Sequence, residues 1–209
     1  MLVTALAGAA IALSFAAPPG PVAMETIRRG LRGGFGPALR VQLGSIIGDM
    51  TWCSVALLGL APLAQVAWLR VALGVAGVAL LVYLGGMGIR DSFKMPIALT
   101  APVTETKRGS FRSGMAISMA NPMAVGYWLS VGGALVAAGV AGSTPAQTAS
   151  FVAGFLGGTF AWAFVMALAV RWGKQLLTPL AFRAVTFVCG AAMLVFGFSL
   201  ASQMIGNLL

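Results

Sequence analysis

The 209-residue chain contains no histidine, only four acidic residues and only two cysteines. Without histidine it lacks the commonest general base and the commonest metal ligand. Cys53 and Cys189 lie in separate apolar stretches with no Cys-x-x-Cys spacing, which argues against a thiol redox centre or a thiolate metal site. No nucleophile and base pair stands within the apolar stretches either. We therefore expect no enzyme, no cofactor and no resident metal.

Charge is scarce throughout, because charged residues make up 8% of the chain and hydrophobic residues 59%. Soluble domains carry roughly 25% charged residues, so the composition indicates an integral membrane protein. At about 20 residues per span, this length allows about six helices and no soluble domain. We expect an all-α membrane protein in which residues 1–209 form a single membrane domain.

Basic residues outnumber acidic ones by 13 to four, and they are unevenly placed. The apolar stretches are residues 2–27, 41–61, 71–89, 113–140, 147–170 and 184–205. The first, third and fifth connections carry all the lysines and arginines except Arg70. The positive-inside rule then places these connections in the cytoplasm and both termini outside. Orientation and contact with anionic lipids explain the positive charge, so we expect no nucleic-acid partner. The first stretch lacks the positive residues that precede the apolar part of a cleaved signal peptide, and is counted as a span.

Six spans divide into two groups of three, and the second group enters the membrane in the opposite direction because three is odd. A short pattern in the second span recurs 110 residues later: Gly44, Gly48 and Trp52 match Gly154, Gly158 and Trp162. This match predicts two inverted three-helix repeats, residues 1–100 and 101–209. The glycine pairs are expected to let helices approach closely.

Proline interrupts the first and fourth spans. The interruptions are Pro18-Pro19-Gly20-Pro21 and Asn121-Pro122. A proline inside a span frees backbone carbonyls that lipid cannot satisfy, so such a break needs neighbouring helices or a watery cavity. Each restarted helix would point unpaired N–H groups and its positive dipole end into the membrane, where they favour a carboxylate. We expect Pro19, Gly20, Pro21, Asn121 and Pro122 to bind substrate; the alternative is a kink that serves packing only.

Asp49 is the acid placed deepest in an apolar stretch, nine residues beyond Arg40 and therefore roughly 13 Å along a helix. Burying its charge costs about 2.5–3.5 kcal/mol on insertion scales. It could neutralise a substrate ammonium group, carry a proton or bind Na⁺; the alternative is a structural hydrogen bond. Glu25 lies three residues before Arg28 and is expected to reach the interface. The matching position in the second half holds Thr159, so only one half carries the charge.

Four further residues are candidates for the lining of a cavity: Trp52, Tyr127, Thr159 and Trp162. Trp52 and Trp162 stand three residues after Asp49 and Thr159, on nearly the same helical face. Tyr127 follows the second break by about a turn and a half. Filling of the core is the alternative role for these bulky side chains.

Taken together, these motifs resemble the lysine-exporter (LysE/RhtB) family of bacterial amino-acid exporters. The matching features are Pro19-Gly20-Pro21, Gly30 and Gly34 in a basic loop, Gly44-xxx-Gly48-Asp49-xx-Trp52, Leu58-Gly59-Leu60, Leu84-Gly85-Gly86-xx-Ile89-Arg90, and Gly114 followed by Asn121-Pro122. The family often has lysine after Asn-Pro, where this chain has Met123, and an acidic or amide residue where Val22 and Ala23 stand. These departures leave the identity of the amino acid open.

The resemblance implies a secondary-active exporter of amino acids or close derivatives in the bacterial inner membrane. We expect alternating access, with protons (or Na⁺) as the coupling ion, Asp49 as the proton carrier and lipids as neighbours. A homodimer is left open. The alternatives are a transporter of a metal or other inorganic ion, and a non-transporting membrane scaffold.

Overall fold

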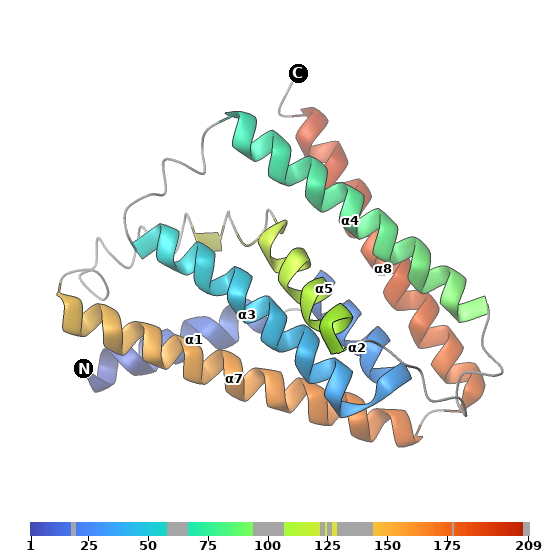
Figure 1. Ribbon diagram of the computed structural model, residues 1–209, viewed down its shortest axis with the longest axis horizontal. Helices are drawn as coiled ribbons and strands as arrows, with labels where there is room; N and C mark the ends of the chain where they lie inside the picture. Colours follow the sequence, from blue (N-terminus) through green and yellow to red (C-terminus); the bar gives the residue numbers. More distant parts are fainter. Residues whose placement is uncertain are drawn as a thin grey trace.

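The computed structural model describes residues 1–17, 20–57, 67–93, 107–121, 124, 127–128, 144–176 and 178–206. The elements in this part of the chain are helices: α1 (Leu2–Ala16), α2 (Pro21–Gly33), α3 (Phe35–Leu57), α4 (Ala67–Phe93), α5 (Lys107–Met119), α7 (Pro145–Leu176) and α8 (Pro179–Gly206). Figure 1 shows them packed lengthwise, with the ends of α2, α4 and α7 and the starts of α3 and α8 gathered at the lower right. The described residues therefore agree with the predicted all-α class.

The chain changes direction between α1 and α2, where the axes differ by 73°. Gly20 is the N-cap of α2 and has an extended backbone, and Pro21 follows in the first turn. Proline suits this position because the first helical N–H groups have no intrahelical acceptor. The helix restart expected at Gly20-Pro21 is thus present, whereas Pro18, Pro19, Pro122 and Met123 lie outside the described residues.

The basic connection after the first apolar stretch is shorter than the sequence suggests. Arg28, Arg29 and Arg32 lie inside α2, and α3 begins at Phe35. Gly34 alone separates the two helices, and its φ of 79° is the left-handed conformation that favours glycine. The expected basic loop is therefore a helical end, because the arginines are good helix formers and the stop signal comes only at Gly34.

Three helix pairs form the main contacts: α1 with α7, α3 with α5, and α4 with α8 (Figure 1). In the first pair, a Cβ atom on Gly154 would collide with the carbonyl oxygen of Ala5, and one on Gly8 with that of Phe151. Glycine is thus required on both sides of this contact, which brings the two backbones together as small residues do in membrane proteins.

The second pair repeats this arrangement. A Cβ atom on Gly44 of α3 would collide with the carbonyl oxygen of Phe111, and one on Gly114 of α5 with that of Val41. The close approach predicted for the glycine pairs is therefore seen at both Gly44 and Gly154.

Among the described helices, Pro145–Lys174 of α7 is long and apolar enough to cross a membrane by itself. The bent pair α1 and α2 passes the same test when taken together, and Val75–Arg90 and Arg183–Ser199 are shorter apolar helices. The number of six spans stays a prediction.

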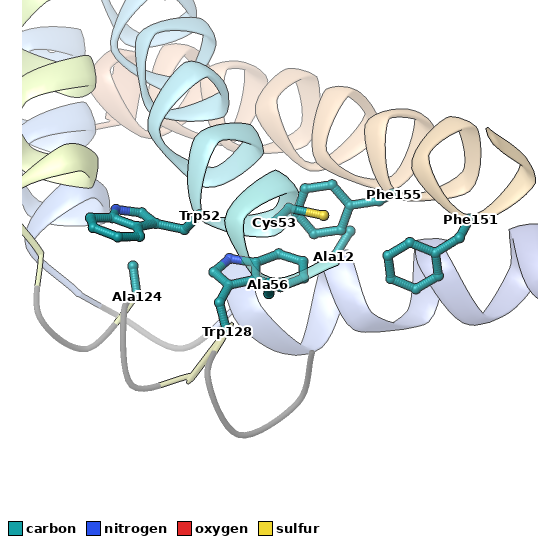
Figure 2. Packing of buried hydrophobic residues seen from close by; sticks show 8 residues of the cluster. All are labelled: Ala12, Trp52, Cys53, Ala56, Ala124, Trp128, Phe151 and Phe155. Carbon is teal, nitrogen blue, oxygen red and sulfur yellow. The ribbon is translucent and has the colours of Figure 1, made fainter. Parts of the chain in front are cut away.

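An apolar cluster joins α1, α3 and α7. Its buried members are Ala12, Trp52, Cys53, Ala56, Ala124, Trp128, Phe151 and Phe155 (Figure 2). The rings of Trp128 and Phe155 meet edge to face, with centroids 5.1 Å apart. Such aromatic contacts add to the hydrophobic gain from burial, so this cluster anchors the helices on one side of the cavity described next.

Candidate functional site

A cavity of about 300 Å³ lies where α1 ends and α2 begins, and residues from α3, α4, α5, α7 and α8 complete its wall. The described residues that line it are Ser14, Phe15, Ala16, Gly20, Pro21, Val22, Ala23, Gln42, Ser45, Ile46, Asp49, Leu81, Ser118, Asn121, Tyr127, Thr159, Trp162, Phe196 and Ser199. This volume is at the small end of the range for small-molecule sites.

The cavity brings together most of the residues singled out from the sequence. Those on its wall are Gly20, Pro21, Asp49, Asn121, Tyr127, Thr159 and Trp162. Two others, Pro19 and Pro122, lie outside the described residues. Trp52 belongs instead to the apolar cluster, where it is buried beside Cys53. Of the two roles considered for Trp52, the structure therefore shows core packing.

Asp49 is the only acidic residue on the described part of the wall, and it is 8% exposed. The Ser118 hydroxyl donates a hydrogen bond of 2.6 Å to Oδ1 of Asp49. Gly48 makes this contact possible, because a Cβ atom there would collide with the Ser118 side chain. No lysine or arginine lines the described part of the cavity. The carboxylate thus meets a hydroxyl and open space instead of a cation.

Gln42 and Ser45 extend the polar surface along α3 and were missed by the sequence analysis. They precede Asp49 by seven and four residues, so the three side chains share one helical face. The Gln42 side-chain amide donates a 2.9 Å hydrogen bond to Thr26 of α2. This helical spacing of polar residues was visible in the sequence and could have identified both.

The start of α2 and the backbone at Asn121 both lie on the cavity wall. At the first, the N–H of Met24 donates to the carbonyl of Gly20, which opens the α2 ladder. Because an α-helix leaves its first N–H groups without helical acceptors, Val22 and Ala23 present backbone donors at the cavity wall. At the second, the N–H of Ala124 donates to the carbonyl of Asn121, 3.0 Å away, just after α5 ends. This hydrogen bond lies where a helix restart was predicted, and Pro122 itself lies outside the described residues.

Aromatic side chains form another part of the wall. The hydroxyl oxygens of Tyr127 and Ser14 lie 3.1 Å apart, and the Tyr127 ring packs on Phe15 with centroids 4.8 Å apart. Trp162 and Phe196 come from α7 and α8. The Thr159 hydroxyl donates to carbonyls of its own helix. This part of the wall is mainly apolar.

Glu25 corrects an expectation. The sequence analysis placed it at the interface, but the structure buries it completely, at 0% exposure. Its two carboxylate oxygens accept hydrogen bonds of 2.8 and 3.0 Å from Arg28, and one of them accepts a further bond from Arg29. The reason is that α2 is covered by α3, α5, α7 and α8, so reach along the helix does not bring Glu25 to the surface.

Comparison with known proteins identifies the family of this chain. The family model for the LysE type translocator matches residues 13–204. The "Chemotactic transduction protein ChpE" of Pseudomonas aeruginosa is 42% identical over 197 residues, covering 93% of this chain and 95% of the relative. The "Putative amino acid efflux protein YcgF" of Bacillus subtilis is 28% identical over 199 residues, covering 95% of each.

No solved structure matches the chain. The family match covers nearly the whole sequence, including every described residue on the cavity wall. Family membership also settles the broad class of molecule: a membrane protein of the transporter type. This chain belongs to the LysE type translocator family.

Proposed function

We propose that this protein is a secondary-active exporter of amino acids or close derivatives, driven by protons and working by alternating access in the bacterial inner membrane. The observation that carries the proposal is Asp49, a buried carboxylate on a cavity whose wall also includes the start of α2. An amino acid carries an ammonium group and a carboxylate, and the cavity offers a partner of opposite polarity for each.

The proposed binding mode follows from this polarity. The substrate ammonium pairs with Asp49, and the substrate carboxylate accepts hydrogen bonds from backbone N–H groups at the start of α2. Helix N-termini favour anions through unpaired N–H groups and the positive end of the helix dipole. In this mode Asn121, another residue of the wall, supports the carboxylate through its side-chain amide.

The proposed architecture is six spans in two inverted repeats, with broken first and fourth spans and both termini outside. The matched glycine contacts support it. Gly8 packs on Phe151 in the pair of α1 and α7, as Gly114 packs on Val41 in the pair of α5 and α3. In this proposal α1 corresponds to α5 and α7 to α3. The two repeats can then rock against each other about the central site, as inverted-repeat transporters do.

In the proposed coupling, a proton and the substrate ammonium compete for the one carboxylate of Asp49. When a proton from outside binds, the ammonium leaves; when the proton is released to the cytoplasm, the next substrate binds. Intramembrane carboxylates serve as proton relays in many transporters. A single carboxylate thus suffices for antiport, and no second acid lies on the described wall.

The test is efflux from cells that lack their own amino-acid exporters and are loaded through dipeptides. The protein, Asp49→Asn and an empty vector are compared while a panel of amino acids is followed outside the cells. Asp91→Asn is the matched control, because this acid lies ten residues beyond Leu81 on α4, about 15 Å along the helix. We expect faster release of particular amino acids with the protein and with Asp91→Asn, and no faster release with Asp49→Asn.

Proton coupling is tested in vesicles with an imposed pH gradient. Export should rise with the gradient and fall when an ionophore collapses it, while a sodium gradient alone should have no effect. An Asp49→Asn protein that exports at the normal proton-dependent rate would contradict the proposed competition between proton and substrate for Asp49. Release that follows the sodium gradient instead would show that Na⁺, and not the proton, is the coupling ion.

A role in signal transduction is a second candidate, favoured by the name of the 42% identical relative, "Chemotactic transduction protein ChpE". Deletion of the gene in its own bacterium separates the two functions. Signalling would be favoured over export if the deletion strain lost directed movement without any change in amino-acid release, and if the Asp49→Asn protein restored that movement.

A further inference from the structure

We propose that the exported solute is an amino acid with an uncharged, apolar side chain, bound as a zwitterion. This inference rests on the proposed function and names the substrate class for that same cavity. It is carried by the charges and the apolar surfaces of the cavity wall.

The charge of the wall is the first step. Among its described residues one side chain, Asp49, carries a formal charge. Residues 122–143, which the structure describes only in part, contain no lysine, arginine, aspartate or glutamate, so they add no charge wherever they lie. One carboxylate and the helix starts are matched by one ammonium and one carboxylate of the substrate.

A second ionic group on the substrate would have no charged partner among the described residues of the wall. A dibasic amino acid would bring a second cation into a cavity whose described wall has no other acid. A buried charge without a counter-charge is strongly unfavourable. An acidic amino acid would bring a second carboxylate beside Asp49 with no lysine or arginine on that wall, and like charges repel at short range. Both classes are therefore disfavoured relative to a zwitterion.

The apolar surface is the second step. Phe15, Ile46, Leu81, Trp162 and Phe196 line the cavity and come from five different helices. On the polar side, α3 contributes Gln42, Ser45 and Asp49, α5 contributes Ser118, and Asn121 follows α5, while Ser14, Thr159 and Ser199 add single hydroxyls from other helices. The polar ends of an amino acid fit the second group of residues and an apolar side chain fits the first, so burial of that side chain adds to the affinity.

Size is the third step. A volume of about 300 Å³ holds one small molecule and leaves little room beyond it. Specificity for apolar side chains by size alone is modest, because one methylene is worth roughly 10–200-fold in a fitted pocket. We therefore infer a class that includes leucine, methionine and phenylalanine, with charge as the main criterion for exclusion.

The experiment uses the full-length protein in proteoliposomes with an outward substrate gradient and an inward proton gradient. Leucine, methionine, phenylalanine, lysine and glutamate are each loaded at the same concentration, and release is followed with labelled compounds. We expect release of at least one apolar amino acid to exceed that of lysine and of glutamate by more than about tenfold. Lysine or glutamate released as fast as the best apolar substrate would overturn this proposal and leave the exporter function intact. Release of no amino acid above protein-free vesicles would overturn both.

A gain of function tests the charge argument directly. Thr159 lines the cavity at the position that matches Asp49 in the second half of the chain. Thr159→Asp adds the missing second acid, and lysine release should then rise while leucine release falls. Thr159→Asn has a similar shape without the charge and should not gain lysine release. A Thr159→Asp protein that still transports leucine and still excludes lysine would contradict the assignment.

Discussion

Two buried carboxylates on neighbouring helices are held in opposite ways. Glu25 on α2 is 0% exposed and receives hydrogen bonds from Arg28 and Arg29, and Arg28 is itself 1% exposed. Asp49 on α3 is 8% exposed and receives one hydrogen bond, from Ser118. The first carboxylate is neutralised inside the protein. The second opens onto a cavity whose described wall carries no cation.

This difference in partners indicates a different role for each carboxylate. A buried acid paired with guanidinium groups is satisfied in every state in which those helices stay together, so its role is to hold α2 in place. The Arg29 guanidinium also donates a hydrogen bond to the Ser110 hydroxyl of α5. A buried acid without a cation keeps the cost of its desolvation until a solute or a proton arrives. The proposed function accounts for this cost by a solute or a proton that binds at Asp49.

The largest expected effect comes from exchanging Glu25 for an amide. Glu25→Gln replaces the carboxylate that pairs with the buried Arg28 and the partly buried Arg29 by a neutral amide, and removal of one partner from a buried ion pair costs about 3–5 kcal/mol. We expect this loss in the free energy of unfolding, measured by equilibrium unfolding in detergent micelles. Asp91→Asn, the same change of charge near the end of α4, serves as the control. If Glu25→Gln unfolds at the same denaturant concentration as the unaltered protein, the ion pairs of Glu25 with Arg28 and Arg29 do not hold α2 in place.

Ser118→Ala is expected to give the next largest loss of stability, and it tests the contact of the second carboxylate, Asp49. It removes the hydroxyl that donates to Asp49, and a hydrogen bond to a charged group is worth about 1.5–3 kcal/mol. Ser113→Ala is the matched control, because that hydroxyl donates only to the Ser110 carbonyl of its own helix. Unfolding measurements should show a larger loss for Ser118→Ala than for Ser113→Ala. Equal losses would mean that the Ser118 contact does not support the carboxylate.

The sequence allowed much of the cavity to be predicted. Prolines and glycines at the restarts of helices have direct steric meaning, and an acid in an apolar stretch is costly enough to be conspicuous. Gly20, Pro21, Asp49 and Asn121 could therefore be placed at one site before the fold was known. The all-α class followed from the hydropathy of the stretches.

The rest depended on packing between helices, which sequence spacing does not reveal. Distance along the chain put Glu25 near the interface, but the cover provided by four other helices buries it. Trp52 and Trp162 stand at matching positions, yet Trp52 fills the apolar cluster and Trp162 lines the cavity. Ser118 lies 69 residues from Asp49 in the sequence, so their contact could be seen only in three dimensions.

The smallest expected effect on stability, from Asp49→Asn, is the most informative about function. The amide oxygen still accepts the Ser118 hydrogen bond, and no cation on the described wall loses its partner. The free energy of unfolding should change by less than about 1 kcal/mol, and removal of the buried charge favours a gain over a loss. Export should nevertheless fall by at least about tenfold, because the substrate ammonium loses its counter-charge. Unfolding and efflux measured on the same purified variant separate these effects. A loss of stability as large as that of Glu25→Gln would show that Asp49 is structural as well, and the contrast between the two carboxylates would then disappear. A stable protein that no longer exports would show that the burial cost of Asp49 is retained for transport.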